Sequence, residues 1–205
     1  MSAGLRDRKK RETRQAISDT ATRLFIQRGF DRVTIAEIAA AAGVSKMTVT
    51  NYFPRKEDLV LDTHEEFTAA LAGAVATRPP GESALAALRR FYFEALAQRS
   101  YSLGIARPGF ARLLLGSPVL LGRVRELQQE QEDRLAEVLI AEGGDAFAAR
   151  AAAAWIVGTY RLLFGEALLR SRDGIGADEL AGHLGRAATE VFDRLDASLG
   201  DFARR

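Results

Sequence analysis

The sequence has no cysteine and only two histidines, residue types on which much enzyme and metal chemistry depends. Without cysteine, disulfides, thiolate nucleophiles and thiolate-bound metals are excluded. His64 and His183 are far apart in the chain, and no metal-ligand spacing, phosphate-binding glycine loop or nucleophile elbow accompanies them. The sequence therefore predicts no cofactor, no metal site and no catalytic residue.

Long apolar runs are also lacking. No run reaches the roughly 20 apolar residues that a membrane-spanning helix needs, and no hydrophobic leader precedes the first expected helix. Hydrophobic residues make up 47% of the chain and charged residues 27%, which is the ordinary mix of a soluble globular protein. We expect a cytoplasmic protein with no membrane partner.

Charge is unevenly distributed although the net charge is only +2. Residues 1–60 carry 12 Lys and Arg against 7 Asp and Glu, a balance of +5, and the remainder carries 17 against 20, a balance of −3. A basic amino-terminal third fits a module that binds a polyanion, although a solvated, salt-bridged surface gives the same count. The basic segment at residues 6–14 is expected to be a flexible arm that reaches a phosphate or a minor groove.

Strand patterns are almost absent, while Ala, Leu, Arg and Glu recur with helical periodicity. The expected fold class is all-α, with about nine helices. A helix-turn-helix domain of three helices should occupy residues 1–55, and a helical ligand-binding and dimerisation domain residues 56–205. The helices are expected at about 9–28, 34–42, 45–52, 55–76, 82–98, a short one within 101–117, 118 to the glycines at 143–144, 145–172 and 177–199.

Residues 34–52 carry the most informative pattern, two short helices joined by a glycine turn. Thr34 followed by Glu37 is a capping box that begins a helix. Gly43 supplies a turn with positive φ, and Ser45 caps the next helix. This arrangement is a helix-turn-helix.

The second of these helices has a face without acidic residues, formed by Lys46, Met47, Thr48, Thr50 and Asn51. Such a face can enter the major groove of DNA, where an asparagine pairs with adenine and a threonine methyl contacts a thymine methyl. Lys56, shortly after, adds a cation that can position a phosphate. The spacing alone also fits a helical hairpin whose polar residues merely face solvent.

A larger set of residues makes the pattern specific by its order and spacing: Ile17, Ala21, Leu24, Phe25, Gly29, Phe30, Thr34, Ile38, Ala39, Ala42, Gly43, Val44, Ser45, Tyr52, Phe53, Lys56, Glu57 and Leu59. In this set the chain resembles the DNA-binding domain of the tetracycline-repressor (TetR) family of bacterial transcriptional regulators. The resemblance implies a homodimer that binds a palindromic double-stranded DNA operator, usually as a repressor, and that a small-molecule effector releases.

The resemblance also implies roles for single residues. Thr34 and Tyr52 match positions that usually contact phosphate, and Lys46 and Thr48 match positions that face DNA. Thr50 and Asn51 stand where the family often has an aromatic residue and a histidine, so readout should differ from the common pattern. The expected DNA contacts are Thr34, Ser45, Lys46, Met47, Thr48, Thr50, Asn51, Tyr52 and Lys56.

The expected helix at 145–172 is apolar on more than one face. One face can pack within its own subunit and another on a second copy. Together with the helix at 177–199 it would form a four-helix interface across a two-fold axis. The alternative is a core helix that lies wholly within one chain.

A pocket for the effector is expected in the same domain. Aromatic rings with a few hydroxyl groups suit a small, largely apolar or aromatic effector, although each such residue also fits an ordinary core. The candidates are His64, Phe91, Tyr92, Tyr101, Phe110, Trp155, Thr159 and Tyr160. Two alternatives remain at this point: a helical dimeric interaction module without sequence-specific DNA binding and, less favoured, an enzyme.

Overall fold

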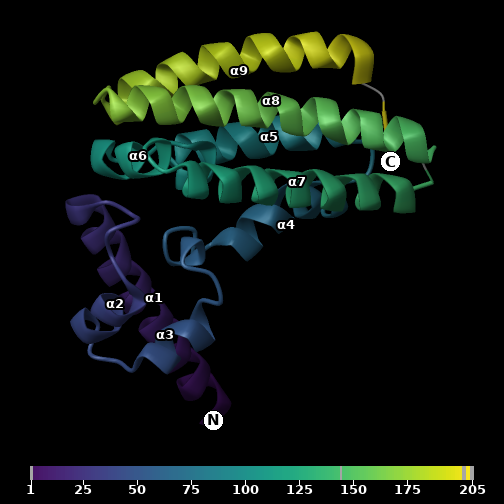
Figure 1. Ribbon diagram of the computed structural model, residues 1–205. Coiled ribbons are helices and arrows are strands. Elements are labelled where there is room, and N and C mark those ends of the chain that lie inside the picture. The colour runs from purple at the N-terminus through teal and green to yellow at the C-terminus, as the bar shows by residue number, and fades with distance from the viewer. Residues whose placement is uncertain (1, 144, 200–201, 204–205) are drawn as a thin grey trace. The chain divides into compact units, whose positions relative to one another are not determined.

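The computed structural model describes residues 2–143, 145–199 and 202–203, and all regular elements in this part of the chain are helical (Figure 1). The expected all-α fold class is therefore confirmed. The elements are α1 (Ser2–Arg28), α2 (Ile35–Ala41), α3 (Lys46–Tyr52), η1 (Glu57–Leu59), α4 (His64–Ala76), α5 (Ala84–Ala97), η2 (Tyr101–Leu103), α6 (Pro108–Leu115), α7 (Pro118–Ala141), α8 (Ala146–Arg172) and α9 (Ala177–Leu199), where η marks a single 3₁₀ turn.

Most helix ends lie close to the expected residues because capping groups fix them. Asp145 accepts hydrogen bonds from the backbone N–H groups of Phe147 (3.0 Å) and Ala148 (2.9 Å) and so begins α8. Gly29, at φ +88°, ends α1 in the left-handed conformation that glycine adopts without strain. These local signals can be read from sequence.

Two expected elements are wrong. α1 begins at Ser2 rather than near Lys9, so the basic segment is helical and not a flexible arm. Its Arg, Lys and Glu residues are good helix formers, and Arg8 pairs with Glu12 one turn on (3.3 Å). The side chain of Arg6, within that segment, and the residue Gly144, expected to end α7, lie outside the described residues.

The expected helix at 55–76 is the second correction, because it divides into η1 and α4. The buried Ser18 on α1 donates a hydrogen bond to the Leu59 carbonyl (3.0 Å), and Arg14 donates to the Asp62 carbonyl (3.1 Å). Side chains from α1 thus contact the carbonyl groups that a continuous helix would use. The break depends on tertiary contacts that a local pattern does not show.

The chain forms two compact units, Met1–His64 with Arg112–Leu121, and Glu65–Ala111 with Gly122–Arg205. The first unit buries Ile17, Phe25, Ile38, Val49 and Phe53, among others, almost completely. In the second unit α9 packs against both α8 and α5, with a core that includes Tyr92, Ile156 and Phe192. Whether function divides between residues 1–55 and 56–205 stays a prediction.

α8 is the one helix, within the described residues, that is long and apolar enough to cross a membrane. Of its most apolar window, 44% is buried in the structure. Length and composition do not distinguish a membrane span from the core helix of a soluble protein. α8 also leaves large apolar side chains exposed, Trp155 and Leu162 among them.

A buried ion pair ties three segments of the second unit together. The side chain of Arg78 is fully buried and binds both carboxylate oxygens of Glu142, at 2.8 and 2.6 Å. It also donates to the carbonyl oxygens of Val75 and Ala203, each at 2.6 Å. One guanidinium therefore joins the end of α4, the segment after α7 and the residues after α9.

We expect Arg78→Met to lower the free energy of unfolding by about 3–5 kcal/mol, as breaking a buried pair does. The substitution removes the donor that serves several buried oxygen atoms at once. Arg89→Met is the matched control, because Arg89 pairs with Asp193 at the surface and such pairs contribute about 0–1 kcal/mol. Urea unfolding followed by circular dichroism measures both, and equal losses would contradict this account.

Candidate functional site

The start of α2 is held by a complete capping box. The Thr34 side chain accepts a hydrogen bond from the Glu37 backbone N–H (3.3 Å), and the Glu37 carboxylate accepts from the Thr34 backbone N–H (2.8 Å). Arg28 on α1 binds the other carboxylate oxygen at 2.6 Å. These bonds lower the pKa of Glu37 to about 2, with the Thr34 backbone bond as the largest cause. α2 is thereby joined to α1 at a charged corner.

The turn between α2 and α3 depends on a left-handed glycine. Gly43 has φ +67°, and the following Val44 N–H donates to the Ala39 carbonyl (3.0 Å). Ile38 and Val49, buried at 0% exposure, anchor the two helices from the inner side. Ala39 is also buried, so a larger side chain there would force the helices apart.

The hydroxyl groups of α3 are mostly engaged within the helix. Ser45 accepts from the Thr48 backbone N–H (3.0 Å), and the Ser45 and Thr48 hydroxyls lie 2.8 Å apart. Thr50 donates its hydroxyl to the Met47 carbonyl (3.1 Å), which leaves its methyl group for external contacts. Lys46 and Asn51 are the exposed hydrogen-bonding groups of longer reach on this helix, and Met47 is 73% exposed.

The end of α3 is held by Arg14, a residue that the sequence analysis did not single out. Its guanidinium donates to the Tyr52 carbonyl (2.7 Å) and lies 4.3 Å from the ring centre of Phe53. The arginine thus satisfies a carbonyl at the helix end and stacks on an aromatic face. Arg14 lies 38 residues before Tyr52 in the chain, so the local sequence gave no signal for this role.

Lys56 turns inward in the structure. Its ammonium donates to the Phe30 carbonyl (2.7 Å) and lies 4.4 Å from the ring centre of Phe30 and 5.4 Å from that of Phe25. These contacts hold the loop after α1. A phosphate contact from the remaining ammonium protons stays a prediction, as do the contacts expected from the exposed Thr34 and the half-buried Tyr52.

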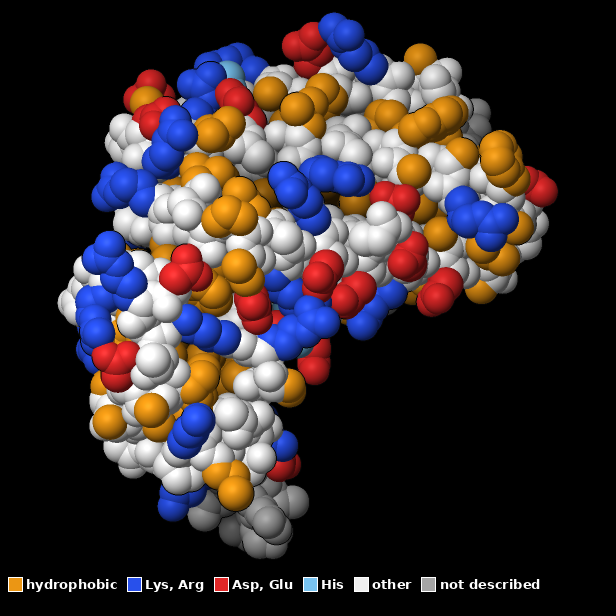
Figure 2. Space-filling model, in the orientation of Figure 1, with side chains coloured by type: hydrophobic (Ala, Val, Ile, Leu, Met, Phe, Trp, Pro, Cys, Tyr) orange, Lys and Arg blue, Asp and Glu red, His pale blue; other side chains and the backbone are white. Residues whose placement is uncertain are grey.

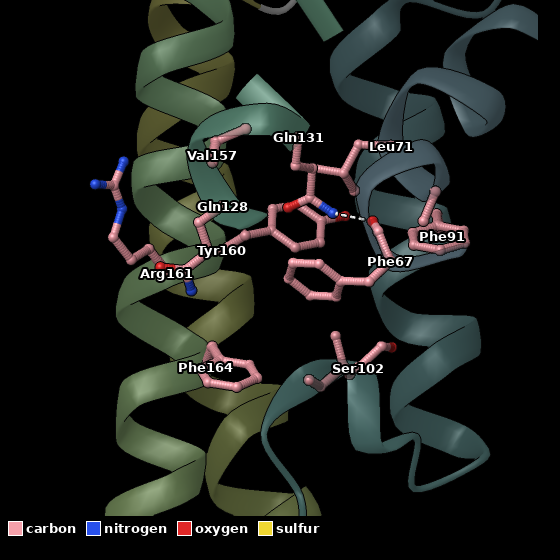
Figure 3. A pocket seen from close by; sticks show the side chains of 12 residues that line it. Phe67, Leu71, Phe91, Ser102, Gln128, Gln131, Val157, Tyr160, Arg161 and Phe164 are labelled. Atoms are coloured by element: carbon pink, nitrogen blue, oxygen red, sulfur yellow. Dashed lines mark hydrogen bonds between the residues drawn. The ribbon is translucent and has the colours of Figure 1, made fainter. Parts of the chain in front are cut away.

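The second unit contains a small cavity with aromatic walls, which is partly open to solvent. Two of the eight expected effector residues, Phe91 and Tyr160, line it (Figure 3). The other lining residues are Phe67, Ala70, Leu71, Ser102, Leu103, Gln128, Gln131, Val157, Arg161 and Phe164. They come from α4, α5, η2, α7 and α8.

The other six expected effector residues do not line this cavity. Tyr92 is 1% exposed in the core, where burial raises its pKa, and Phe110 is half-buried. Tyr101 and Trp155 are 69% and 54% exposed. Thr159 donates its hydroxyl to the Trp155 carbonyl (3.0 Å), and the His64 ring lies 3.0 Å from the Leu61 carbonyl in the first unit. These positions were predicted from residue type alone. Whether a residue lines the cavity depends on the side of its helix on which it lies.

The cavity residues that sequence reasoning missed are chiefly Phe67, Phe164 and the two glutamines of α7. Gln128 and Gln131 are three residues apart, and both are about 95% buried. Two glutamines at helical spacing amid apolar residues of one face are a signal that was available, since buried amides usually serve a partner.

Comparison with known proteins places these features among bacterial regulators. Residues 17–63 match the family described as "Bacterial regulatory proteins, tetR family". The transcriptional regulator TcmR of Streptomyces glaucescens is 32% identical over 146 residues, which are 69% of this chain and 65% of TcmR. AcrR of Shigella flexneri is 44% identical over 54 residues, 26% of this chain and 25% of AcrR. The chain thus spans less than two thirds of these curated relatives.

Solved structures share the fold over most of the chain. NalD of Pseudomonas aeruginosa, titled the secondary repressor of the MexAB-OprM multidrug efflux pump, has a TM-score of 0.58 and 20% identity, with 88% of this chain and 97% of NalD covered. The regulator FadR of Bacillus subtilis, solved with stearoyl-CoA, has a TM-score of 0.51 and 19% identity, with 87% and 97% covered. At these identities the likeness concerns the fold alone.

The capping box generates a prediction about acid. The carboxyl group of Glu37 should titrate with a midpoint at about pH 2. Because its pKa is lowered in the folded state, its contribution to stability is full above the ordinary value of 4.5 and is lost as the pH falls through about 2. Nuclear magnetic resonance of the Glu37 side chain, followed against pH, measures the midpoint.

Arg28→Ala is the informative variant, because it removes one of the bonds that hold the Glu37 carboxylate. The midpoint should rise toward 4.5 while α2 stays helical. A midpoint already near 4.5 in the unmodified protein would show that the box does not form in solution.

Proposed function

Because the chain belongs to the tetR family of bacterial regulatory proteins, we propose that it is a ligand-responsive transcriptional regulator. It binds a palindromic DNA operator as a homodimer, acts as a repressor in the cytoplasm, and is released by a small, largely apolar effector. The relatives by sequence are named as transcriptional regulators of the helix-turn-helix type, which supports this proposal over an enzyme.

The observation that carries the proposal is the outer surface of α3. It has no acidic residue, and its exposed Lys46 and Asn51 donate hydrogen bonds of the kind that base edges accept. The exposed Met47 and the methyl of Thr50 add apolar groups suited to thymine methyls. Capping at Ser45 and Arg14 holds the helix at both ends, so these groups are presented on a rigid element.

The exposed side of α8 supports a homodimer. Trp155, Leu162 and Leu169 recur every seven residues and are 54%, 64% and 41% exposed. Gly158 and Gly165 lie between them on the same stripe, and Ala151 lies one turn before Trp155. Large side chains thus alternate with small ones, as helices need in order to interdigitate. Figure 2 shows hydrophobic side chains gathered at the surface over the amino-terminal end of α8.

A second copy of α8, with α9 beside it, would cover this stripe across a two-fold axis. Burying three large apolar side chains that are now exposed favours association by about 1.5–3 kcal/mol each at full burial. A dimer also supplies the two copies of α3 that a palindromic operator requires.

Operator binding is the first experiment. A labelled duplex from the DNA that flanks this protein's own gene is titrated and followed by fluorescence anisotropy, with a scrambled duplex as control. We expect binding at least about a thousandfold tighter to the flanking duplex, the low end for specific recognition. Equal and salt-sensitive binding to both would point to a distant operator. If the folded dimer bound neither duplex, the interaction-module alternative would replace the proposal.

Asn51→Ala tests base readout directly. It should weaken operator binding by about 1–3 kcal/mol and leave binding to the scrambled duplex nearly unchanged, because a bidentate contact with adenine is specific. The same anisotropy assay on both duplexes measures the difference. An equal loss on the two would remove Asn51 from the residues that read bases.

Leu162→Glu tests the dimer. A carboxylate in the centre of the α8 stripe would have to be buried without a partner, so we expect monomers at concentrations where the unmodified chain is dimeric. Analytical ultracentrifugation measures the mass. Gln129→Glu is the control, since Gln129 is exposed on α7 and receives the same new side chain. If Leu162→Glu remained dimeric, the interface would lie elsewhere.

A further inference from the structure

Gln128 is a buried polar side chain that the fold leaves without a partner. It is 5% exposed and lines the cavity of the second unit. Within the described part of the chain its amide makes no hydrogen bond. Among the described residues, the fully enclosed side-chain polar atoms without a partner belong to Tyr92 and Arg99. The Gln128 amide therefore keeps a small accessible surface and has capacity for a partner from outside the chain.

The other polar groups of the cavity are already occupied. Gln131 donates to the Phe67 carbonyl (2.7 Å), a bond drawn in Figure 3. Tyr160 donates its hydroxyl to the Leu88 carbonyl (2.6 Å). The Ser102 hydroxyl lies 2.8 Å from that of Ser100. Of the described lining side chains with hydrogen-bonding groups, Gln128 is therefore the one that makes no bond within the described part of the chain.

The charged side chain in the described lining of the cavity, Arg161, is half-exposed and already paired. Its guanidinium binds Glu132 on α7 at 3.4 Å. Figure 3 shows the Arg161 side chain extending away from the aromatic rings. An ionic ligand among these rings would lose its hydration without gaining a counter-charge, which strongly disfavours it.

The walls are aromatic. The lining includes the rings of Phe67, Phe91, Tyr160 and Phe164 as well as Gln128 (Figure 3). Aromatic side chains prefer offset or edge-to-face contacts with other rings, so a flat aromatic body fits this wall better than a flexible chain does. A carboxamide side chain presents one acceptor oxygen and two donor hydrogens.

We propose that Gln128 is the specificity-determining residue of this cavity and that the effector is an electrically neutral, flat aromatic molecule carrying both a hydrogen-bond donor and an acceptor. The amide of Gln128 pairs with these two groups, and the aromatic body lies among the rings. That this ligand regulates DNA binding rests on the proposed function. That it binds to Gln128 depends on the cavity alone.

Three probes with the same naphthalene ring system distinguish recognition by hydrogen bonds, by charge and by apolar contact alone. 2-Naphthamide is neutral and carries a hydrogen-bond donor and an acceptor. 2-Naphthoate is anionic, and 2-methylnaphthalene is apolar. Their own fluorescence anisotropy reports binding to the full chain without DNA. We expect 2-naphthamide to bind about tenfold or more tightly than either of the others, the factor that one satisfied buried polar group supplies.

Gln128→Leu should remove the preference for 2-naphthamide and improve the binding of 2-methylnaphthalene. Gln128→Met, whose flexible chain packs into irregular space, repeats the test if the branched leucine alters the fold. Gln129→Leu is the matched control, because this neighbouring glutamine is exposed and bonds Asp133 (3.0 Å). It should leave the order of the three probes unchanged.

Tighter binding of 2-naphthoate than of 2-naphthamide would overturn the proposal in favour of Arg161 as the recognising group. An unchanged preference in both Gln128 variants, or no binding of any probe, would overturn it as well. Operator binding by the same preparation is measured separately. A chain that binds its operator but fails the probe test therefore loses only this inference, and a chain that passes the probe test without binding DNA loses the proposed function.

Discussion

Backbone carbonyl groups near the ends of helices need hydrogen-bond donors, and in this chain side chains from other segments supply several of them. Arg14 serves the last turn of α3, Lys56 serves the loop after α1, and Arg78 serves the end of α4. Each of these cations is thereby occupied in holding the fold. The side chains available for a ligand are those that do not hydrogen-bond to backbone carbonyl groups of other segments. On α3 they include Lys46 and Asn51, and in the cavity Gln128.

This constraint explains how much could be predicted from the sequence. Thr34, Ser45 and Gly43 act on groups within a few residues, so the ends of α2 and α3 were predictable. The interruption between η1 and α4 was not, because Ser18 and Arg14 contact it from 41 and 48 residues away in the chain. The inward turn of Lys56 likewise depends on Phe30, 26 residues earlier. Contacts within a few residues can be predicted from the sequence. The hydrogen-bond partner of a long Lys or Arg side chain can be identified only when the fold is known.

The cavity was only partly predictable for a related reason. Aromatic residues were selected by type, yet Tyr160 lines the cavity while Trp155, five residues before it on α8, is exposed. A helix that is apolar all round gives no polar face from which to assign its inner side. Its alanines and glycines add to the difficulty, because small residues fit a core, a cavity wall and a helix–helix contact equally well. The use of each residue follows from the packing of α8 against its neighbours, α9 and η2 among them.

On the proposed function, the two glutamines of α7 have different parts in the response to a ligand. The bond from Gln131 to the Phe67 carbonyl fastens α7 to the first turns of α4, and α4 follows directly in the chain from the unit that contains α3. A ligand that pairs with Gln128 alone gains affinity without disturbing this bond. A ligand that also bonded to Gln131 would compete with this contact between α7 and α4. The shift in DNA binding cannot exceed the difference between its affinities for the two states, so tight binding alone does not ensure release.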